Sequence, residues 1–248
     1  MLSLQEMIKK GGSSLLDLIY PPHCALCEKR LAMDERGGLC LRCLSQIPKN
    51  IPPFCPSCGR HYAGVKSAPR CGMCEGKHFP FDHLWFVAPY EGALRETLHK
   101  LKYEGRKPIA NSLAQLLITF LKDELHPFVF EEVLPVPLER QKERERQFNQ
   151  SALLAKALAE ALHIPFSSGN LIRVRATLPQ SSLPREKRVE NVRDAFRVRN
   201  PSLYAGKNLL LIDDIVTTGA TLSACAEVLR VAGAREISIV ALAGGVTG

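Results

Sequence analysis

The sequence predicts an α/β fold, in which a parallel sheet carries helices on both faces and follows a small cysteine-rich module. Strand-like apolar runs alternate with amphipathic helical segments from residue 81 onward, which is typical of a parallel sheet. Residues 209–212 are four consecutive large apolar residues, the pattern of a central strand buried on both faces. Before residue 81, cysteines, prolines and glycines replace large apolar residues. We therefore place the module at residues 1–80 and the α/β domain at residues 81–248.

The spacing of apolar residues gives the order of the elements. We expect an amphipathic helix within residues 3–20, ahead of the cysteines. In the α/β domain we expect strands at residues 83–89, 129–137, 171–175, 196–198, 209–212 and 236–243. We expect helices through Leu98, over residues 108–125, through Leu158 and through Cys225. Cys225, the ninth cysteine, lies on the apolar face of its helix and is expected in the core.

Eight of the nine cysteines fall into four Cys-x-x-Cys pairs, and two such pairs complete a tetrahedral zinc site. The spacing predicts two structural zinc ions. It leaves open whether neighbouring pairs combine or whether the first pair combines with the third. Neighbouring pairs close shorter loops at a lower entropic cost, so we favour them. The predicted ligands are then Cys24, Cys27, Cys40 and Cys43 for one ion, and Cys55, Cys58, Cys71 and Cys74 for the other.

Composition limits the location and the partners of the protein. No apolar run approaches the ~20 residues of a membrane span, and the N-terminal sequence lacks the long apolar core of a secretion signal. We therefore expect a cytoplasmic protein, where thiols stay reduced. The formal net charge is +8, but two zinc ions on eight thiolates would lower it to roughly +4. The total charge therefore gives no argument for nucleic-acid binding.

The stretch from Leu209 to Thr221 carries the strongest functional signal. Asp213 and Asp214 follow the buried strand, and a run rich in threonine and glycine leads into an amphipathic helix. Ligands of open α/β sheets bind at the carboxyl ends of strands, and helix N-termini hold phosphates. The carboxylates would repel a phosphate, but they suit hydroxyl groups or a divalent cation. A phosphate beside vicinal hydroxyls is a ribose 5-phosphate, and no lysine follows Gly219 as in a nucleotide-binding loop.

Two charged segments accompany this stretch. Residues 139–146 form a predicted loop at the end of a strand, and their cations suit the oxygens of a pyrophosphate. Residues 176–193 begin without apolar periodicity and are rich in arginine toward their end. We expect them to form a mobile loop that leads into a short helix and acts as a lid.

Several segments together resemble one family. Residues 212–219 (Ile-Asp-Asp-Ile-Val-Thr-Thr-Gly) closely resemble the ribose-phosphate motif of type I phosphoribosyltransferases. The cysteine pairs, Lys102-Tyr103-x-Gly105, the run 146–150 (Arg-Gln-Phe-Asn-Gln), Thr177-x-x-Gln180 and Arg188-x-x-Asn191 are similar to segments of the ComF family. That family consists of bacterial phosphoribosyltransferase-like proteins linked to competence. The resemblance spans the chain from about residue 15 to residue 243.

The resemblance implies a type I phosphoribosyltransferase-like domain behind a double zinc ribbon. Asp213 and Asp214 would hold the ribose hydroxyls of phosphoribosyl pyrophosphate, which binds with magnesium. Single-stranded DNA and competence proteins are the implied partners. The remaining implied ligand-binding residues are Val216, Thr217, Thr218, Gly219, Ala220 and Thr221 around the 5-phosphate, with Lys102, Lys142, Arg144, Arg146 and Arg188 as cations.

Gln147 departs from the family, which usually has glycine after the arginine of this run. If the position has a positive φ, glutamine strains the turn by ~1 kcal/mol or more. Two functions remain in competition. The first is a phosphoribosyltransferase with an unidentified acceptor base, and the second is an adaptor for nucleic acid that binds a phosphoribosyl ligand without turnover.

Overall fold

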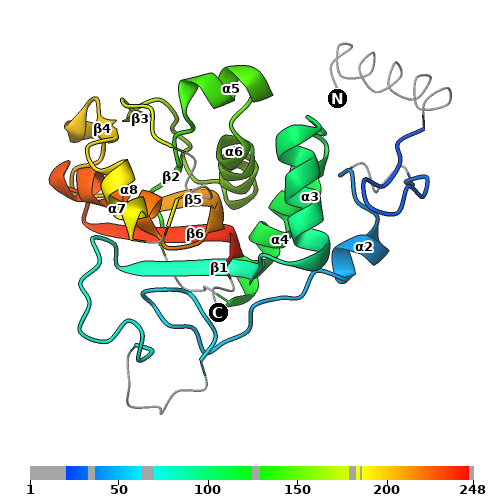
Figure 1. The fold of residues 1–248 in the computed structure, drawn as a ribbon, viewed down its shortest axis with the longest axis horizontal. Coiled ribbons are helices and arrows are strands. Elements are labelled where there is room, and N and C mark those ends of the chain that lie inside the picture. Colours follow the sequence, from blue (N-terminus) through cyan, green and yellow to red (C-terminus); the bar gives the residue numbers. More distant parts are fainter. Residues whose placement is uncertain are drawn as a thin grey trace.

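The computed structural model describes residues 21–32, 37–62, 70–124, 129–178, 183–184 and 186–245. The predicted helix within residues 3–20 lies outside the described residues. Four parallel strands form the main sheet (Figure 1). Their order is β1 (His83–Pro89), β6 (Glu236–Gly244), β5 (Asn208–Val216) and β2 (Glu132–Pro135). Each neighbouring pair is parallel, which confirms the predicted sheet.

Strand β5 is buried on both faces, as its apolar sequence predicts. Leu210 and Ile212 pack into one apolar cluster, whereas Leu209 and Leu211 pack into the other. All four side chains are fully buried. Because successive side chains of a strand point to opposite faces, both faces of the sheet require a covering layer.

Helices supply these two layers. One face carries α3 (Gly92–Tyr103), α4 (Ile109–Glu124) and α6 (Gln150–Leu162), which belong to the same apolar cluster as Leu210. The other face carries α8 (Ala220–Val231) and the short α7 (Lys187–Val192). Leu222, Cys225, Ala226 and Leu229 are the buried stripe of α8, as their spacing predicts.

Two predicted strands do not join the main sheet. β3 (Leu171–Arg173) and β4 (Phe196–Val198) pair with each other, antiparallel, in a separate two-stranded sheet. The expectation that they belong to the parallel sheet is therefore wrong. Each has only three paired residues, and Leu171 and Phe196 pack on the α8 side of the main sheet. A short apolar run specifies a strand but not its partner.

The segments at residues 139–146 and 129–137 differ from the prediction. Residues 139–146, expected as a loop, contain helix α5 (Arg140–Arg146). This helix buries no residue, so it has no apolar periodicity, and its arginine, lysine, glutamine and glutamate are strong helix formers. The expected strand at residues 129–137 is shorter, since β2 covers only Glu132–Pro135. The remaining short elements are α2 (Leu41–Ser45) and a 3₁₀ turn, η2 (Pro201–Leu203).

The first cysteine segment, which carries Cys24, Cys27, Cys40 and Cys43, packs against α3 and α4 (Figure 1). Lys100 Nζ on α3 donates to the Ala25 carbonyl at 2.7 Å, and Ser112 Oγ on α4 donates to the Gly37 carbonyl at 2.7 Å. At Gly38 the backbone approaches so closely that a Cβ would lie 2.7 Å from the amide nitrogen of Ile109. This contact and its φ of +85° both require glycine.

The second cysteine segment, which carries Cys55, Cys58, Cys71 and Cys74, covers the edge of the main sheet formed by β1. Gly59 forms a parallel bridge with Trp85 on β1, and the Leu84 amide donates to the Pro56 carbonyl at 2.7 Å. The Asn50 side chain donates to the carbonyls of Gly59 and Phe86. An edge strand left bare would present unpaired backbone groups, and this segment pairs part of them. Contacts of both cysteine segments cross residue 81, and the boundary there stays a prediction.

No helix among the described ranges is both long enough and apolar enough to cross a membrane.

Candidate active site and metal centres

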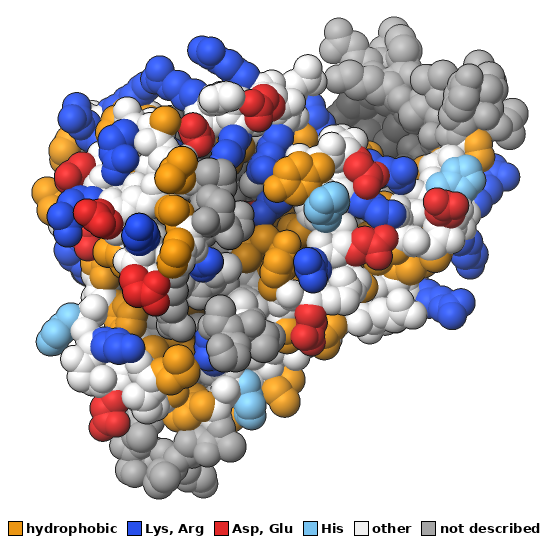
Figure 2. Space-filling view, viewed as in Figure 1, with side chains coloured by type: hydrophobic (Ala, Val, Ile, Leu, Met, Phe, Trp, Pro, Cys, Tyr) orange, Lys and Arg blue, Asp and Glu red, His pale blue; other side chains and the backbone are white. Residues whose placement is uncertain are grey.

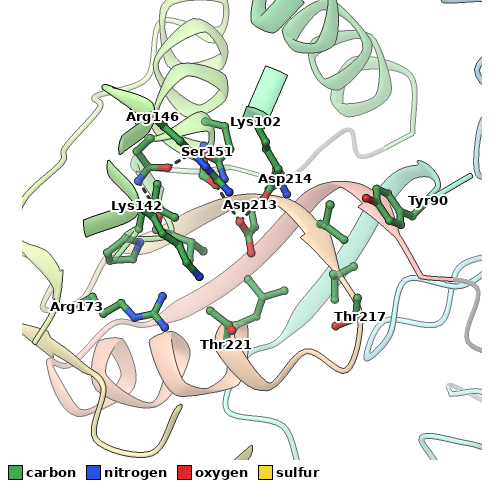
Figure 3. Close-up of a pocket in the computed structure, with 18 of the residues that line it drawn as sticks. Tyr90, Lys102, Lys142, Arg146, Ser151, Arg173, Asp213, Asp214, Thr217 and Thr221 are labelled. Carbon is green, nitrogen blue, oxygen red and sulfur yellow. Dashed lines mark hydrogen bonds and ion pairs between the residues drawn. The ribbon is translucent and has the colours of Figure 1, made fainter. Parts of the chain in front are cut away.

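A cleft of about 910 Å³ opens at the carboxyl ends of β5 and β2. Its lining comes from both layers of helices and from the loops that follow the strands. Figure 3 shows Asp213 and Asp214 near its centre, with Lys102, Ser151, Lys142 and Arg146 on one side and Thr217 and Thr221 on the other. Parallel strands place ligand sites at this edge. The cleft therefore lies where the sequence predicts a ligand site, at the carboxyl end of the central strand.

The two aspartates are almost buried and are held by defined donors. Asp213 is 9% exposed and Asp214 is 6% exposed. Asp213 Oδ1 accepts from the Ser151 hydroxyl at 2.9 Å and from the Asp214 amide at 2.9 Å. Lys102 Nζ, from the last turn of α3, forms an ion pair with Asp214 Oδ2. The acid pair is therefore fixed by α6, by its own backbone and by α3.

These surroundings raise the pKa of Asp213. Burial, followed by the negative charge of Asp214, raises the pKa of Asp213 to about 8. The hydrogen bonds from the Asp214 amide and Ser151, and the charge of Lys102, oppose this rise. Near neutral pH Asp213 therefore holds a proton, and a protonated carboxyl both donates and accepts hydrogen bonds. Vicinal hydroxyl groups, which also donate and accept, are suited to such a pair.

The end of β5, the loop after it and the start of α8 form a candidate anion-binding cradle. Residues 216–221, from Val216 to Thr221, line the cleft. Gly219 has a φ of +76° and precedes α8, whose first amides have no partner within the helix. The Thr218 hydroxyl accepts from the Ala220 amide at 3.4 Å. Amides and hydroxyls at a helix N-terminus bind phosphate. The cradle therefore offers a place for a phosphate, and it closely follows the two acids in the chain.

Cations outnumber acids in the cleft. Besides the two aspartates, Glu145 is the acidic side chain among the described lining residues. The cationic lining residues are Lys102, Lys142, Arg146, Arg173 and Arg188. Figure 2 shows further lysine and arginine side chains gathered over α5. Of the predicted cations, Arg144 is exposed on α5 and does not line the cleft.

Ser151, Arg173 and Tyr90 are among the lining residues that were not predicted as site residues. Ser151 lies in the first turn of α6, directly after the run 146–150, and that position is the signal that would have found it. Arg173 lies on β3 and points into the cleft (Figure 3). Its buried Nε has no hydrogen-bond partner within the described part of the chain. Tyr90 follows β1 and lies at the opposite end of the cleft from Arg173.

Helix α7 brings the expected lid segment to the cradle. Arg188 donates from Nη1 to the Thr217 hydroxyl at 3.4 Å and from Nε to the Leu183 carbonyl at 3.0 Å. Residues 179–182 and 185 of this segment lie outside the described residues. Arg188 therefore stands beside the loop that would hold the phosphate.

Gln147 adopts the conformation expected for the family's glycine. Its φ is +62° and its ψ is 13°, the left-handed region, at the end of α5. A non-glycine residue there carries a strain of ~1 kcal/mol. Next to it, the Asn149 side chain caps α6 by accepting from the Ser151 and Ala152 amides. The turn therefore places the end of α5 at the cleft, and α6 begins beside Asp213.

The eight paired cysteines form two separate groups, and neighbouring pairs combine as predicted. The sulfur atoms of Cys24, Cys27, Cys40 and Cys43 lie within 4.8 Å of one another, and so do those of Cys55, Cys58, Cys71 and Cys74. Cys27 and Cys40 have their sulfurs 3.7 Å apart, and Cys58 and Cys71 show the same distance. Four thiolates at ~2.3 Å from a zinc ion stand roughly 3.8 Å apart, whereas disulfide sulfurs are bonded at ~2.05 Å. Both groups therefore fit zinc.

An equivalent hydrogen bond is present within each of the two groups. The Cys40 amide donates to Cys24 Sγ at 3.4 Å, and the Cys71 amide donates to Cys55 Sγ at 3.4 Å. Burial raises the pKa of Cys24, but several backbone amides together outweigh it and lower that pKa to about 6. The same balance lowers the pKa of Cys55 to about 7. Burial raises the pKa of Cys43, Cys58 and Cys74 in the same groups. Because zinc binds thiolates, the amides that lower the pKa of Cys24 and Cys55 favour metal binding there.

Comparisons with known proteins agree with both parts of the chain. Residues 15–75 match the double zinc ribbon domain family, and residues 149–247 match the phosphoribosyl transferase domain family. The chain is 33% identical over 228 residues to the DNA utilization protein YhgH of Escherichia coli (strain K12), covering 90% of this chain and 96% of that protein.

The similarity extends to a protein of a second bacterium. The chain is 31% identical over 242 residues to competence protein ComFC of Bacillus subtilis (strain 168), covering 90% of this chain and 93% of that protein. Among solved structures, the allosteric regulatory enzyme of purine biosynthesis matches with a TM-score of 0.38 and 23% identity, over 54% of this chain and 26% of that one.

Proposed function

Because this chain belongs to the ComF family, we propose that it is a phosphoribosyltransferase that uses phosphoribosyl pyrophosphate and serves the uptake and use of DNA. One observation carries the proposal. The aspartate pair and the phosphate cradle are consecutive on β5 and α8 and open into the same cleft. Vicinal hydroxyls and a phosphate, bound by neighbouring parts of one cleft, are the two ends of a ribose 5-phosphate.

Each end of the ligand has its own part of the cleft. The 5-phosphate lies in the cradle formed by residues 216–221, where the amides of α8 and the threonine hydroxyls bind it. The ribose hydroxyls bind Asp213 and Asp214. The ring then faces the side of the cleft that carries Lys142, Arg146 and Arg173.

These cations serve the departing pyrophosphate. Loss of pyrophosphate leaves positive charge on the ribose ring, as in glycoside hydrolysis, while negative charge builds on the leaving group. Cations that are already in place stabilise that negative charge without reorganising during the reaction. The segment that carries Arg188 lies against the cradle and is suited to exclude water once the ligand is bound.

Magnesium bound together with phosphoribosyl pyrophosphate stays a prediction. The aspartates fit a magnesium ion poorly, because Asp213 Oδ1 accepts two protein donors and Asp214 Oδ2 is paired with the Lys102 ammonium. The acids are therefore assigned to the ribose hydroxyls, and no step is derived through a metal ion. The two zinc ions are assigned a structural role, since each would hold a segment that packs against α3, α4 or β1.

The second candidate is an adaptor that binds the ligand without turnover and handles nucleic acid. The name DNA utilization protein and the basic side chains over α5 favour it. Arg60 and Lys77, which line a smaller cavity beside Cys58 and Cys74, do not favour the adaptor. A zinc ion with four thiolates carries a net charge of about −2, which these two cations balance.

A turnover assay separates the two candidates. Pyrophosphate release from phosphoribosyl pyrophosphate is measured with each nucleobase, with and without single-stranded DNA. The enzyme hypothesis expects release with at least one acceptor, and release that disappears when Asp213 is replaced by alanine. Tight binding with no release under any condition would favour the adaptor.

A further inference from the structure

The ion pair between Lys102 and Asp214 is unusually well buried for its position in an open cleft. The Lys102 side chain is 15% exposed and that of Asp214 is 8% exposed. A lysine ammonium is strongly hydrated, so its burial requires a partner of opposite charge. Asp214 supplies that charge, and Lys102 in turn brings a positive charge to the acid pair.

Lys102 is fixed in this position by the first cysteine segment. Successive residues of a helix are about 100° apart, so Lys100 and Lys102 leave α3 on nearly opposite sides. Lys100 donates to the Ala25 carbonyl at 2.7 Å, on the side of the cysteines. The helix is thereby held between the cysteine segment and the cleft, with Lys102 directed at Asp214 (Figure 3).

We propose that Lys102 is the resident counter-ion of the ribose-binding acids, so that the pair binds vicinal hydroxyls without a divalent cation. This inference rests on the proposed function, because it concerns the same ligand. A divalent cation at Asp214 would lie beside the Lys102 ammonium and would be repelled by it. Oδ1 of Asp213 already accepts from Ser151 and the Asp214 amide, so this oxygen gives a cation little compensation. Lys102 acts through Asp214 and is a positioning residue.

The test is a titration of ribose 5-phosphate, measured by calorimetry with EDTA and with Mg²⁺. Ribose 5-phosphate lacks the pyrophosphate, so its affinity reports the acids and the cradle alone. The wild-type protein is expected to bind it equally, within about twofold, under both conditions. Lys102→Met is expected to bind at least about tenfold more weakly in EDTA, the effect of one charged hydrogen bond, and to recover with Mg²⁺.

Two further variants isolate the charge of Lys102. Lys102→Arg keeps the charge and is expected to bind without Mg²⁺, as the wild type does. Lys156→Met removes an exposed lysine of α6 outside the cleft, which pairs with Glu160 at 3.9 Å, and is expected to create no Mg²⁺ requirement. Carbon-detected NMR adds a second readout. Because the Lys102 charge lowers the pKa of Asp213, Lys102→Met should raise that pKa.

The outcomes separate this inference from the proposed function. A wild-type protein that binds phosphoribosyl pyrophosphate but binds ribose 5-phosphate only with Mg²⁺ overturns the inference alone. A Lys102→Met protein with full affinity in EDTA, or with a loss that Mg²⁺ does not restore, also overturns it alone. A wild-type protein that binds neither ligand overturns both. Should Lys102→Met fail to fold, the wild-type comparison still decides.

Discussion

Ser151 donates a hydrogen bond of 2.9 Å from its hydroxyl to Oδ1 of Asp213, which links the first turn of α6 to the end of β5. α6 begins there because Asn149 caps it, and Asn149 also donates to the Val136 carbonyl at 3.0 Å beyond β2. The sequence between β2 and α6 therefore decides where a donor meets the acid. Burial, followed by the negative charge of Asp214, raises the pKa of Asp213 to about 8 in this position, and the hydrogen bond from Ser151 opposes that rise.

The raised pKa of Asp213 predicts a pH dependence of stability. Its folded pKa is about 8, whereas an unfolded aspartate titrates near pH ~3.9. Between these values the folded state holds a proton that the unfolded state has released, so the free energy of unfolding falls as pH rises from about 4 to about 8. Asp213→Asn should flatten this fall and raise the melting temperature most at pH 8. Melting curves at pH 5, 6.5 and 8 measure it.

A matched control removes an exposed carboxylate. Asp123→Asn, near the end of α4, should leave the shape of the wild-type pH profile unchanged. Parallel profiles for wild type and Asp213→Asn would contradict the raised pKa.

The sheet and the metal sites could be predicted because their signals are local. Four apolar residues of β5 suffice for a strand buried on both faces, and Cys-x-x-Cys pairs hold their own geometry. Helix α5 was missed because its residues bury nothing and so leave no periodicity. The place of Arg173 in the cleft and the ion pair between Lys102 and Asp214 were not predicted. Both bring together segments that are far apart in the chain, and the spacing of residues does not report such contacts.

The two cysteine groups predict two zinc ions that are lost independently. Cys27→Ser, at the exposed ligand of the first group, should leave about one zinc per chain, because the second group has its own four sulfurs. Elemental analysis of the purified proteins measures this. Cys225→Ser, a buried thiol that belongs to neither group, should keep both ions. Loss of both ions from Cys27→Ser would mean that the two sites are not independent.

Arg146 and Arg144 form a matched pair on α5, since one lines the cleft and the other does not. Arg146→Glu should weaken binding of phosphoribosyl pyrophosphate by roughly 1.5–3 kcal/mol, the value of a charged hydrogen bond, with little effect on ribose 5-phosphate. Arg144→Glu should change neither affinity by more than about 0.5 kcal/mol, as for an exposed charge. Equal losses for the two variants would show that only the general charge of α5 matters.

Gln147 gives a prediction about stability. Gln147→Gly should stabilise the fold by up to roughly 0.5 kcal/mol, because glycine relieves ~1 kcal/mol of strain at a φ of +62° but loses roughly 0.5–1 kcal/mol through its freer unfolded chain. Gln141→Gly, inside α5, should destabilise by a similar amount, because its backbone is helical. Urea denaturation of both variants measures the two free energies. A loss of stability in Gln147→Gly would place the strain elsewhere.

The most direct test of the account compares ribose 5-phosphate with 2-deoxyribose 5-phosphate by calorimetry on the wild-type protein. Both ligands offer the same phosphate to the cradle at residues 216–221, but only the first has the vicinal hydroxyls for Asp213 and Asp214. The account predicts that the deoxy ligand binds roughly 10- to 100-fold more weakly, the loss of one hydrogen bond to a charged group. Equal affinities would show that the aspartates do not hold the ribose, and would contradict the assignment of this cleft.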